Sequence, residues 1–218
     1  MLVRDRMTPN PITILPTVSV HDAFRVSREN GVHYLPVVNA RGMLLGIVTR
    51  TDMMRASPSS ATTLTIFEAN YLLAHLQVRE VMSSPAITVP PESPLEEAAR
   101  LMVEREISCL PVMEGRELVG IITEGDIFRA FVEILGGGDP ALRVTLCAQD
   151  VPGELARLTA LIAELGGNLH SVAAFRGADP GRVYFTFRLE GVDEGMLAPE
   201  LEKLGEQVVH VYRTGQLE

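Results

Sequence analysis

The pattern of apolar and polar positions predicts a series of strands and helices that occurs twice along the chain. In the first copy, residues 12–15 are extended, and a helical spacing of apolar residues follows the capping-box pattern at residues 19–22 and stops near Gly31. Two short apolar runs, 34–38 and 44–48, flank a turn that contains glycine. They have no polar face, so they are predicted to be buried strands.

The same succession returns about 75 residues later. Ser93 is suited to be the N-cap of its helix, with Pro94 at the first helical position. Apolar strands are predicted at 109–113 and 118–122. Between the copies, residues 57–77 contain a further capping box followed by leucines at helical spacing, which predicts a separate helix.

The second copy ends in a predicted helix, 126–135, and the glycine-rich segment after it breaks the chain. The remaining residues alternate as strand 143–148, helix 153–165, strands 169–175 and 182–189, helix 194–204 and strand 207–212. This βαββαβ order is that of a ferredoxin-like domain, with both helices on one face of an antiparallel sheet. The predicted domains are repeat 1 at 1–56, an inter-repeat helical segment at 57–77, repeat 2 at 78–135, a Gly-rich linker at 136–141 and a C-terminal domain at 142–218.

Composition narrows the classes of function. The 218 residues are 46% hydrophobic and 22% charged, as in a folded globular protein. A net charge of −9 argues against nucleic acid and anionic membrane surfaces as partners. The sequence has no signal-peptide pattern and no apolar run long enough to span a bilayer, so we expect a cytoplasmic protein with no membrane partner.

Catalytic and metal-binding patterns are weak. Cys109 and Cys147 lie far apart, without His or Cys neighbours at ligand spacing, and the five histidines are scattered. No local nucleophile–base motif is present, which weakens the case for catalysis without excluding distant partners. We therefore expect no enzyme activity, no metal site and no resident cofactor.

Three short motifs occur in both copies: Met-Thr-Pro or Met-Ser-Ser-Pro at the start, Leu-Pro-Val in a strand, and Gly-Ile-(Val/Ile)-Thr-x-x-Asp at the end. On these motifs, residues 1–135 resemble a tandem pair of cystathionine-β-synthase (CBS) domains. The resemblance implies a disc-like, Bateman-type module that binds an adenosine nucleotide (AMP, ADP or ATP) or S-adenosylmethionine as a regulatory ligand.

The resemblance also implies that each cleft takes its base contacts from one copy and its Thr and Asp from the other. One site would then consist of Thr13, His33, Tyr34, Thr123 and Asp126, and the second of Thr88, Ser108, Cys109, Thr49 and Asp52. A carboxylate can accept both ribose hydroxyl protons, and a threonine hydroxyl can serve ribose or phosphate.

Each of these residues has an alternative interpretation. Thr-x-x-Asp also fits a helix capping box, in which the carboxylate only satisfies backbone donors. A histidine on a cleft wall, such as His33, is often only packed or solvated. The copies also differ in charge, because His33 corresponds to Ser108 and Arg50 to Glu124, so the two clefts are not electrostatically alike.

The C-terminal domain resembles the ACT domain, a regulatory module that commonly binds amino acids between side-by-side copies. The matching residues are Asp150-Val-Pro-Gly153-Glu-Leu155 and Gly-Gly-Asn168-Leu. The resemblance implies amino-acid binding by Asp150, Gly153, Leu155 and Asn168, with backbone donors at a helix start facing the ligand carboxylate. Alternatively, the two glycine-containing turns only start and end a helix, and the domain only pairs subunits. Asp150 would repel a carboxylate unless the ligand's amino group faces it.

A CBS pair, an inter-repeat segment and an ACT domain in this order are similar to the acetoin-utilisation regulatory (AcuB-type) proteins. We therefore expect a non-catalytic sensor that relays ligand binding through a homodimer to a metabolic enzyme, in a pathway such as acetoin utilisation. The alternative is a structural or adaptor protein that forms homodimers and whose clefts are empty.

Overall fold

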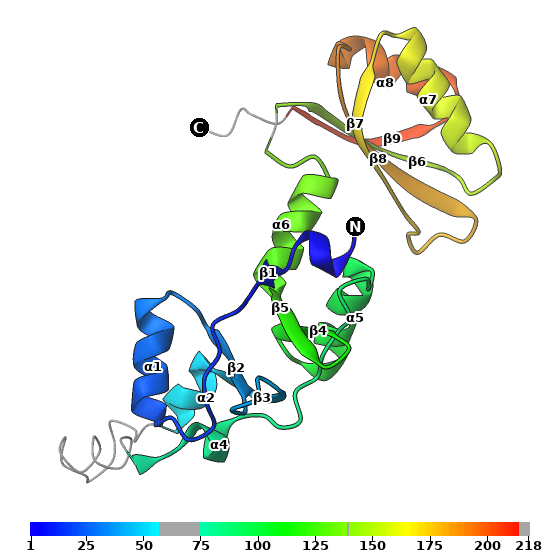
Figure 1. Ribbon diagram of the computed structural model, residues 1–218. Helices are drawn as coiled ribbons and strands as arrows, with labels where there is room; N and C mark the ends of the chain where they lie inside the picture. Colours follow the sequence, from blue (N-terminus) through cyan, green and yellow to red (C-terminus); the bar gives the residue numbers. More distant parts are fainter. Residues whose placement is uncertain (57–74, 139, 214–218) are drawn as a thin grey trace. The chain divides into compact units, whose positions relative to one another are not determined.

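The structure is a computed structural model that describes residues 1–56, 75–138 and 140–213 (Figure 1). The chain divides into two compact units, Met1–Phe128 and Arg129–Glu218. Most of the predicted inter-repeat helix, residues 57–74, lies outside the described residues, and the predicted domain ranges stay predictions. In the described part of the chain, no helix combines the length and the apolar character needed to cross a membrane.

The first repeat forms the predicted helix and hairpin. Its elements are η1 (Val3–Asp5), β1 (Thr8–Pro9), α1 (Val20–Glu29), β2 (Tyr34–Val38), β3 (Leu44–Thr49) and α2 (Arg50–Arg55). The predicted cap of α1 is confirmed, because the Ser19 hydroxyl accepts a hydrogen bond from the Asp22 backbone N–H at 3.0 Å. Both predicted strands are also confirmed, and they pair antiparallel with Tyr34 opposite Thr49.

The second repeat repeats this arrangement with α4 (Val78–Val81), α5 (Leu95–Arg105), β4 (Cys109–Glu114), β5 (Glu117–Thr123) and α6 (Glu124–Ile134). The predicted cap of α5 is wrong. The helix starts at Leu95, Pro94 occupies the cap position, and no side chain caps the helix. The N-terminal segment explains this start, since Val3 N–H donates to the Ser93 carbonyl and Leu95 N–H donates to the Met1 carbonyl.

The two repeats exchange short segments. Strand β1 of the first repeat pairs with β5 of the second, giving the sheet order β1-β5-β4. In return, Ser83 forms a bridge with Ile47 of β3, with backbone hydrogen bonds of 2.8 and 3.0 Å. Gly46 permits this approach, because a Cβ there would lie 2.5 Å from the Ser83 carbonyl oxygen. The exchange fixes how the repeats face each other.

A small core lies where the repeats meet. Ile47 of the first repeat and Cys109 and Ile121 of the second are buried together, and Tyr34 packs against them. A larger core fills the first repeat between α1, α2 and the hairpin. Burial of the apolar side chains between the repeats stabilises their association in one unit.

The C-terminal unit contains the predicted βαββαβ order. Its elements are β6 (Leu142–Gln149), α7 (Glu154–Glu164), β7 (Asn168–Phe175), β8 (Arg182–Glu190), α8 (Glu194–Lys203) and β9 (Gln207–Arg213). The four strands form an antiparallel sheet in the order β7-β8-β6-β9. Both helices cover one face of this sheet (Figure 1), where Leu158 and Leu201 pack with Phe187 in the core. The ferredoxin-like arrangement is thus confirmed, and the ACT assignment stays a prediction.

Candidate functional site

A cleft lies between the two repeats of the first unit. Its volume is about 560 Å³, within the range of small-molecule sites. The first repeat lines it with the start of β2, the end of β3 and helix α2. The second repeat contributes residues from 83–87 and from 106–109, just before and at the start of β4. Both repeats therefore supply walls of one cavity.

Thr49 and Asp52 stand on the wall supplied by the first repeat. Oδ2 of Asp52 accepts hydrogen bonds from the backbone N–H and the hydroxyl of Thr49, at 2.9 and 2.8 Å. The Thr49 hydroxyl in turn accepts from the Asp52 N–H at 3.1 Å, which completes a capping box at the start of α2. Within the described ranges, Oδ1 of Asp52 has no hydrogen-bond partner. The cap therefore fixes the carboxylate and leaves one oxygen for a ligand.

The part of the wall formed by Tyr34, Ser108 and Cys109 is neutral and partly buried. Burial raises the pKa of the Tyr34 hydroxyl, and Ser108 of the second repeat lines the same cleft. Cys109 is 6% exposed, and burial, with smaller contributions from the charges of Asp52 and Glu124, raises the pKa of its thiol to about 12. Cys109 is therefore a neutral thiol at physiological pH.

Charged side chains of both signs line the cleft. Arg50, Arg55 and His33 line it together with the carboxylates of Asp52 and Glu106. The Arg50 guanidinium is also held 5.6 Å from the centre of the Phe24 ring. Two permanent positive charges beside a carboxylate suit a ligand that carries both hydroxyl groups and an anionic group.

The cleft brings together four residues of one predicted site: Thr49, Asp52, Ser108 and Cys109. Thr88 does not line it, although its neighbour Ile87 does. His33 and Tyr34, assigned from the sequence to the other site, also line this cleft. The hairpin register explains their position, because Tyr34 pairs with Thr49 and so lies beside the Thr-x-x-Asp segment of its own repeat.

The remaining residues of the other predicted site, Thr13, Thr123 and Asp126, do not line this cleft. Thr123 and Asp126 form the same capping box at the start of α6, with the Thr123 hydroxyl donating to Asp126 Oδ2 at 2.6 Å. Asp126 is only 8% exposed. The two aspartates thus share a cap geometry and differ in access, and the binding roles of these residues stay predictions.

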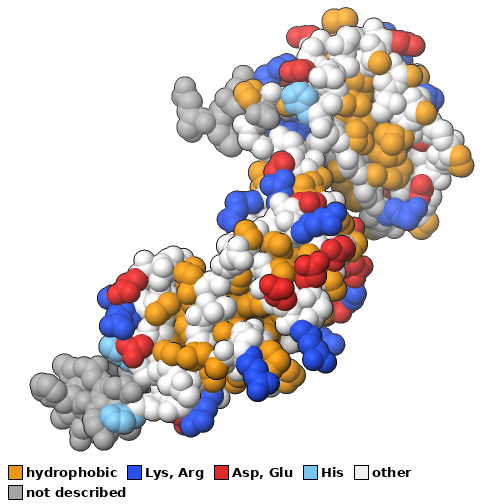
Figure 2. Space-filling view, in the orientation of Figure 1, with side chains coloured by type: hydrophobic (Ala, Val, Ile, Leu, Met, Phe, Trp, Pro, Cys, Tyr) orange, Lys and Arg blue, Asp and Glu red, His pale blue; other side chains and the backbone are white. Residues whose placement is uncertain are grey.

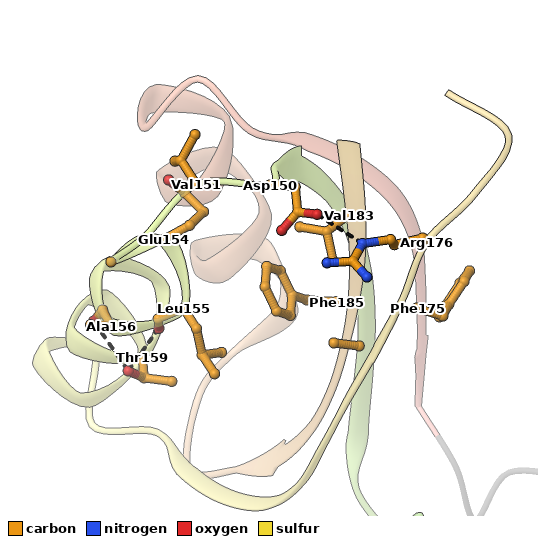
Figure 3. Close-up of a pocket in the computed structure, with 12 residues that line it drawn as sticks. Asp150, Val151, Glu154, Leu155, Ala156, Thr159, Phe175, Arg176, Val183 and Phe185 are labelled. Atoms are coloured by element: carbon orange, nitrogen blue, oxygen red, sulfur yellow. Dashed lines mark hydrogen bonds and ion pairs between the residues drawn. The ribbon is translucent and has the colours of Figure 1, made fainter. Parts of the chain in front are cut away.

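A second pocket, of about 800 Å³, lies in the C-terminal unit (Figure 3). Three of the four residues predicted there, Asp150, Gly153 and Leu155, line it. Arg176, which the sequence analysis did not single out, also lines it and forms an ion pair with Asp150, with 2.9 Å between Nε and Oδ2. Its position directly after a predicted strand was the one signal available.

Asn168, the fourth predicted residue, does not line this pocket. It starts β7, whereas the pocket is built around the end of that strand. Its side-chain N–H donates to Glu190 Oε1 at 3.2 Å. This hydrogen bond, together with a smaller contribution from His170, lowers the pKa of Glu190. The structure therefore places Asn168 at the end of β7 that is far from the pocket.

Comparison with known proteins supports the repeat assignment. The model of the CBS domain family matches residues 3–59 and 78–133, which together exceed half of the chain. The two matched segments coincide with the two structural repeats.

Solved structures match the same part of the chain. The CBS domain pair of protein MJ0100, in complex with 5′-methylthioadenosine and S-adenosyl-L-methionine, is 30% identical with a TM-score of 0.51 and covers 60% of this chain and 95% of its own. A candidate acetoin utilization protein (AcuB) from Vibrio cholerae is 33% identical, with a TM-score of 0.52 and coverage of 62% and 93%. CBSX2 in complex with AMP is 31% identical, with a TM-score of 0.51 and coverage of 61% and 97%.

Several curated relatives are much longer than the matched region. Four that are 30–38% identical match 54–60% of this chain, and the chain spans only 21–32% of their length. Their similarity concerns the CBS pair and does not extend to the rest of those proteins.

Proposed function

The chain belongs to the CBS domain family, and from that premise we propose that it is a non-catalytic sensor of an adenosine ligand: AMP, ADP, ATP or S-adenosylmethionine. The observation that carries the proposal is the cleft in which Thr49 and Asp52 of one repeat face Ser108 and Cys109 of the other. Solved relatives with CBS pairs hold AMP, or methylthioadenosine and S-adenosylmethionine.

In this cleft the ligand would be bound by three kinds of contact. Oδ1 of Asp52 accepts hydrogen bonds from the ribose hydroxyls, while Oδ2 stays in the cap. The purine lies against the neutral wall formed by Tyr34, Ser108 and Cys109. A phosphate group lies toward Arg50 and Arg55, whose guanidinium groups can form charge-assisted hydrogen bonds with it.

Ligand binding would act by holding the repeats together. A ligand shifts a conformational balance only by its difference in affinity for the two arrangements, and a ligand bound to both walls favours the closed one. We propose that this change is relayed through a homodimer to a metabolic enzyme in the cytoplasm, with acetoin utilisation as a candidate pathway.

Edge strands and exposed apolar side chains support the homodimer. In the described sheet, β7 and β9 each pair on one side only. Hydrophobic side chains gather on the visible face of the C-terminal unit (Figure 2), and the exposed ones of this unit include Val151, Leu155, Val172 and Phe175. Light scattering coupled to size-exclusion chromatography tests this point, since a mass of one chain at micromolar concentration would reject it.

The experiment that tests the sensor itself is calorimetric titration of the purified protein with AMP, ADP, ATP and S-adenosylmethionine. The sensor predicts micromolar binding of at least one compound. No binding of any of them would favour the alternative of an adaptor whose clefts are empty. Mass spectrometry of a ligand that survives purification would identify the compound directly.

A second candidate function concerns the pocket of the C-terminal unit, for which we propose amino-acid binding. The favouring observation is a cavity that combines Asp150 and Arg176 with apolar walls. A thermal-shift screen of the twenty amino acids tests it, and a melting temperature that no amino acid raises would reject it.

A further inference from the structure

The pocket of the C-terminal unit contains a carboxylate and a guanidinium group that face each other (Figure 3). Asp150 directly follows β6, Arg176 directly follows β7, and the two side chains form an ion pair with a distance of 2.9 Å. The Arg176 side chain is 81% exposed and that of Asp150 38%. An ion pair this exposed contributes little to stability, so a ligand can separate the two side chains at small cost.

The neighbouring acid at the start of α7 is already engaged. Glu154 lines the pocket but is only 8% exposed, and its carboxylate accepts a hydrogen bond from Arg157 at 2.6 Å. Asp150 is therefore the carboxylate that the pocket can offer to a ligand. The adjoining walls are apolar, with Leu155, Val183 and Phe185 lining the cavity.

We propose that Arg176 binds the carboxylate of an amino acid with an apolar side chain, and that Asp150 binds the ammonium group of the same ligand. This inference rests on the proposed amino-acid function of the pocket. The ligand would break the ion pair between Asp150 and Arg176 and form one ion pair with each of them. Its carboxylate takes the place of Asp150, and its ammonium group takes the place of Arg176. The guanidinium of Arg176 presents a planar fork of donors that matches a carboxylate.

This orientation reverses the one that the ACT resemblance implies, in which backbone donors at the helix start face the carboxylate. In this chain Asp150 lies just before the start of α7, and a ligand carboxylate placed against it would be repelled. Arg176 lies beside Asp150 (Figure 3), so a positive and a negative partner for the ligand's two charged groups stand next to each other.

The test measures three probes of similar shape by calorimetry on the full chain: L-leucine, 3-methylbutylamine, which lacks the carboxylate, and 4-methylpentanoate, which lacks the ammonium group. Arg176→Gln should weaken leucine binding about 10- to 100-fold, as expected for the loss of a charge-assisted hydrogen bond. The same variant should bind the amine no more weakly than the wild type does, because Asp150 is retained. Arg213→Gln, which changes an exposed arginine at the end of β9, is the matched control and should leave all three affinities unchanged.

The effects of Arg176→Gln on leucine binding and on amine binding together distinguish a specific role of Arg176 from a damaged fold. A distorted pocket would weaken leucine and the amine together, and that result would overturn the inference, as would unchanged leucine binding by Arg176→Gln. In both cases the amino-acid function would stand, because the wild type binds leucine. If the wild type binds none of leucine, valine and phenylalanine but binds another amino acid, the inference fails and the function stands. If no amino acid raises the melting temperature, the function fails and the inference fails with it.

Discussion

Asp52 accepts two hydrogen bonds from Thr49 through a single carboxylate oxygen, at 2.9 and 2.8 Å. This geometry joins two interpretations that the sequence left as alternatives. The aspartate caps helix α2, and its other oxygen is still available in a cleft that both repeats line. A structural role and a binding role are therefore compatible at this residue.

The cap itself should contribute measurable stability. Thr49→Ala removes the hydroxyl that donates to Asp52 and accepts from its N–H, and should lower the free energy of unfolding by about 1 kcal/mol. Thr51→Ala, an exposed threonine two residues further along in the first turn of α2, should change it by less than about 0.5 kcal/mol. Urea denaturation of both variants measures the difference, and equal effects would argue against the cap.

Cys109 should react slowly in the folded protein. Because burial raises the pKa of its thiol to about 12, a fraction of only about 10⁻⁴ is thiolate at pH 8. In a Cys147→Ser background, labelling by Ellman's reagent should be at least about 100-fold slower in buffer than in urea. Rapid stoichiometric labelling of the native protein would show that the wall of the cleft is open around Cys109.

Glu206 should make stability fall with rising pH. Burial, reinforced by the neighbouring carboxylate of Glu154, raises the pKa of Glu206 above the value of about 4.3 in the unfolded chain. The folded state therefore holds this proton more tightly, so its contribution is complete below pH 4.3 and is lost as pH rises through the folded pKa. In Glu206→Gln the free energy of unfolding should decline less than in the wild type between about pH 4 and pH 7. Parallel curves would contradict this.

The contribution of Glu190 to stability should depend on pH in the opposite direction. Hydrogen bonds from Asn168 and His170 lower its pKa, so its contribution is present above the unfolded pKa and is lost as pH falls through the folded one. Asn168→Ala should therefore reduce the acid-side loss of stability below about pH 4.3. Denaturation curves recorded at pH 3 and pH 6 check this, and an acid-side loss equal to that of the wild type would count against it.

The sequence predicted the elements better than their contacts. Strand periodicity located β2 and β4 within one residue, because these runs are short, apolar and bounded by turns. The start of α5 was missed because it depends on Ser93 and Leu95 pairing with the chain's N-terminal segment, a contact between distant residues that no local rule contains. The local sequence Ser93-Pro94 is typical of a capped helix start, which is why the prediction placed the N-cap at Ser93.

The candidate sites show the same limit. Thr49 and Asp52 could be found from a repeated motif, whereas Arg176 belongs to no motif. It meets Asp150 because β6 and β7 both run antiparallel to β8 and so finish at the same end of the sheet. Asn168 had the right residue type, but it lies at the other end of β7. Positions that depend on strand direction and register need the fold, and residue identity alone does not give them.

The most direct test of the sensor is calorimetric titration of AMP into the wild type, Asp52→Asn and Asp126→Asn. Asp52→Asn retains the size of the side chain but removes the charge that ribose hydroxyls would meet, and it should weaken binding about 10- to 100-fold. Asp126→Asn alters the equivalent but buried residue of the second repeat and should leave the affinity of this cleft within about twofold, with stability reduced instead. Wild-type affinity in Asp52→Asn would contradict the account.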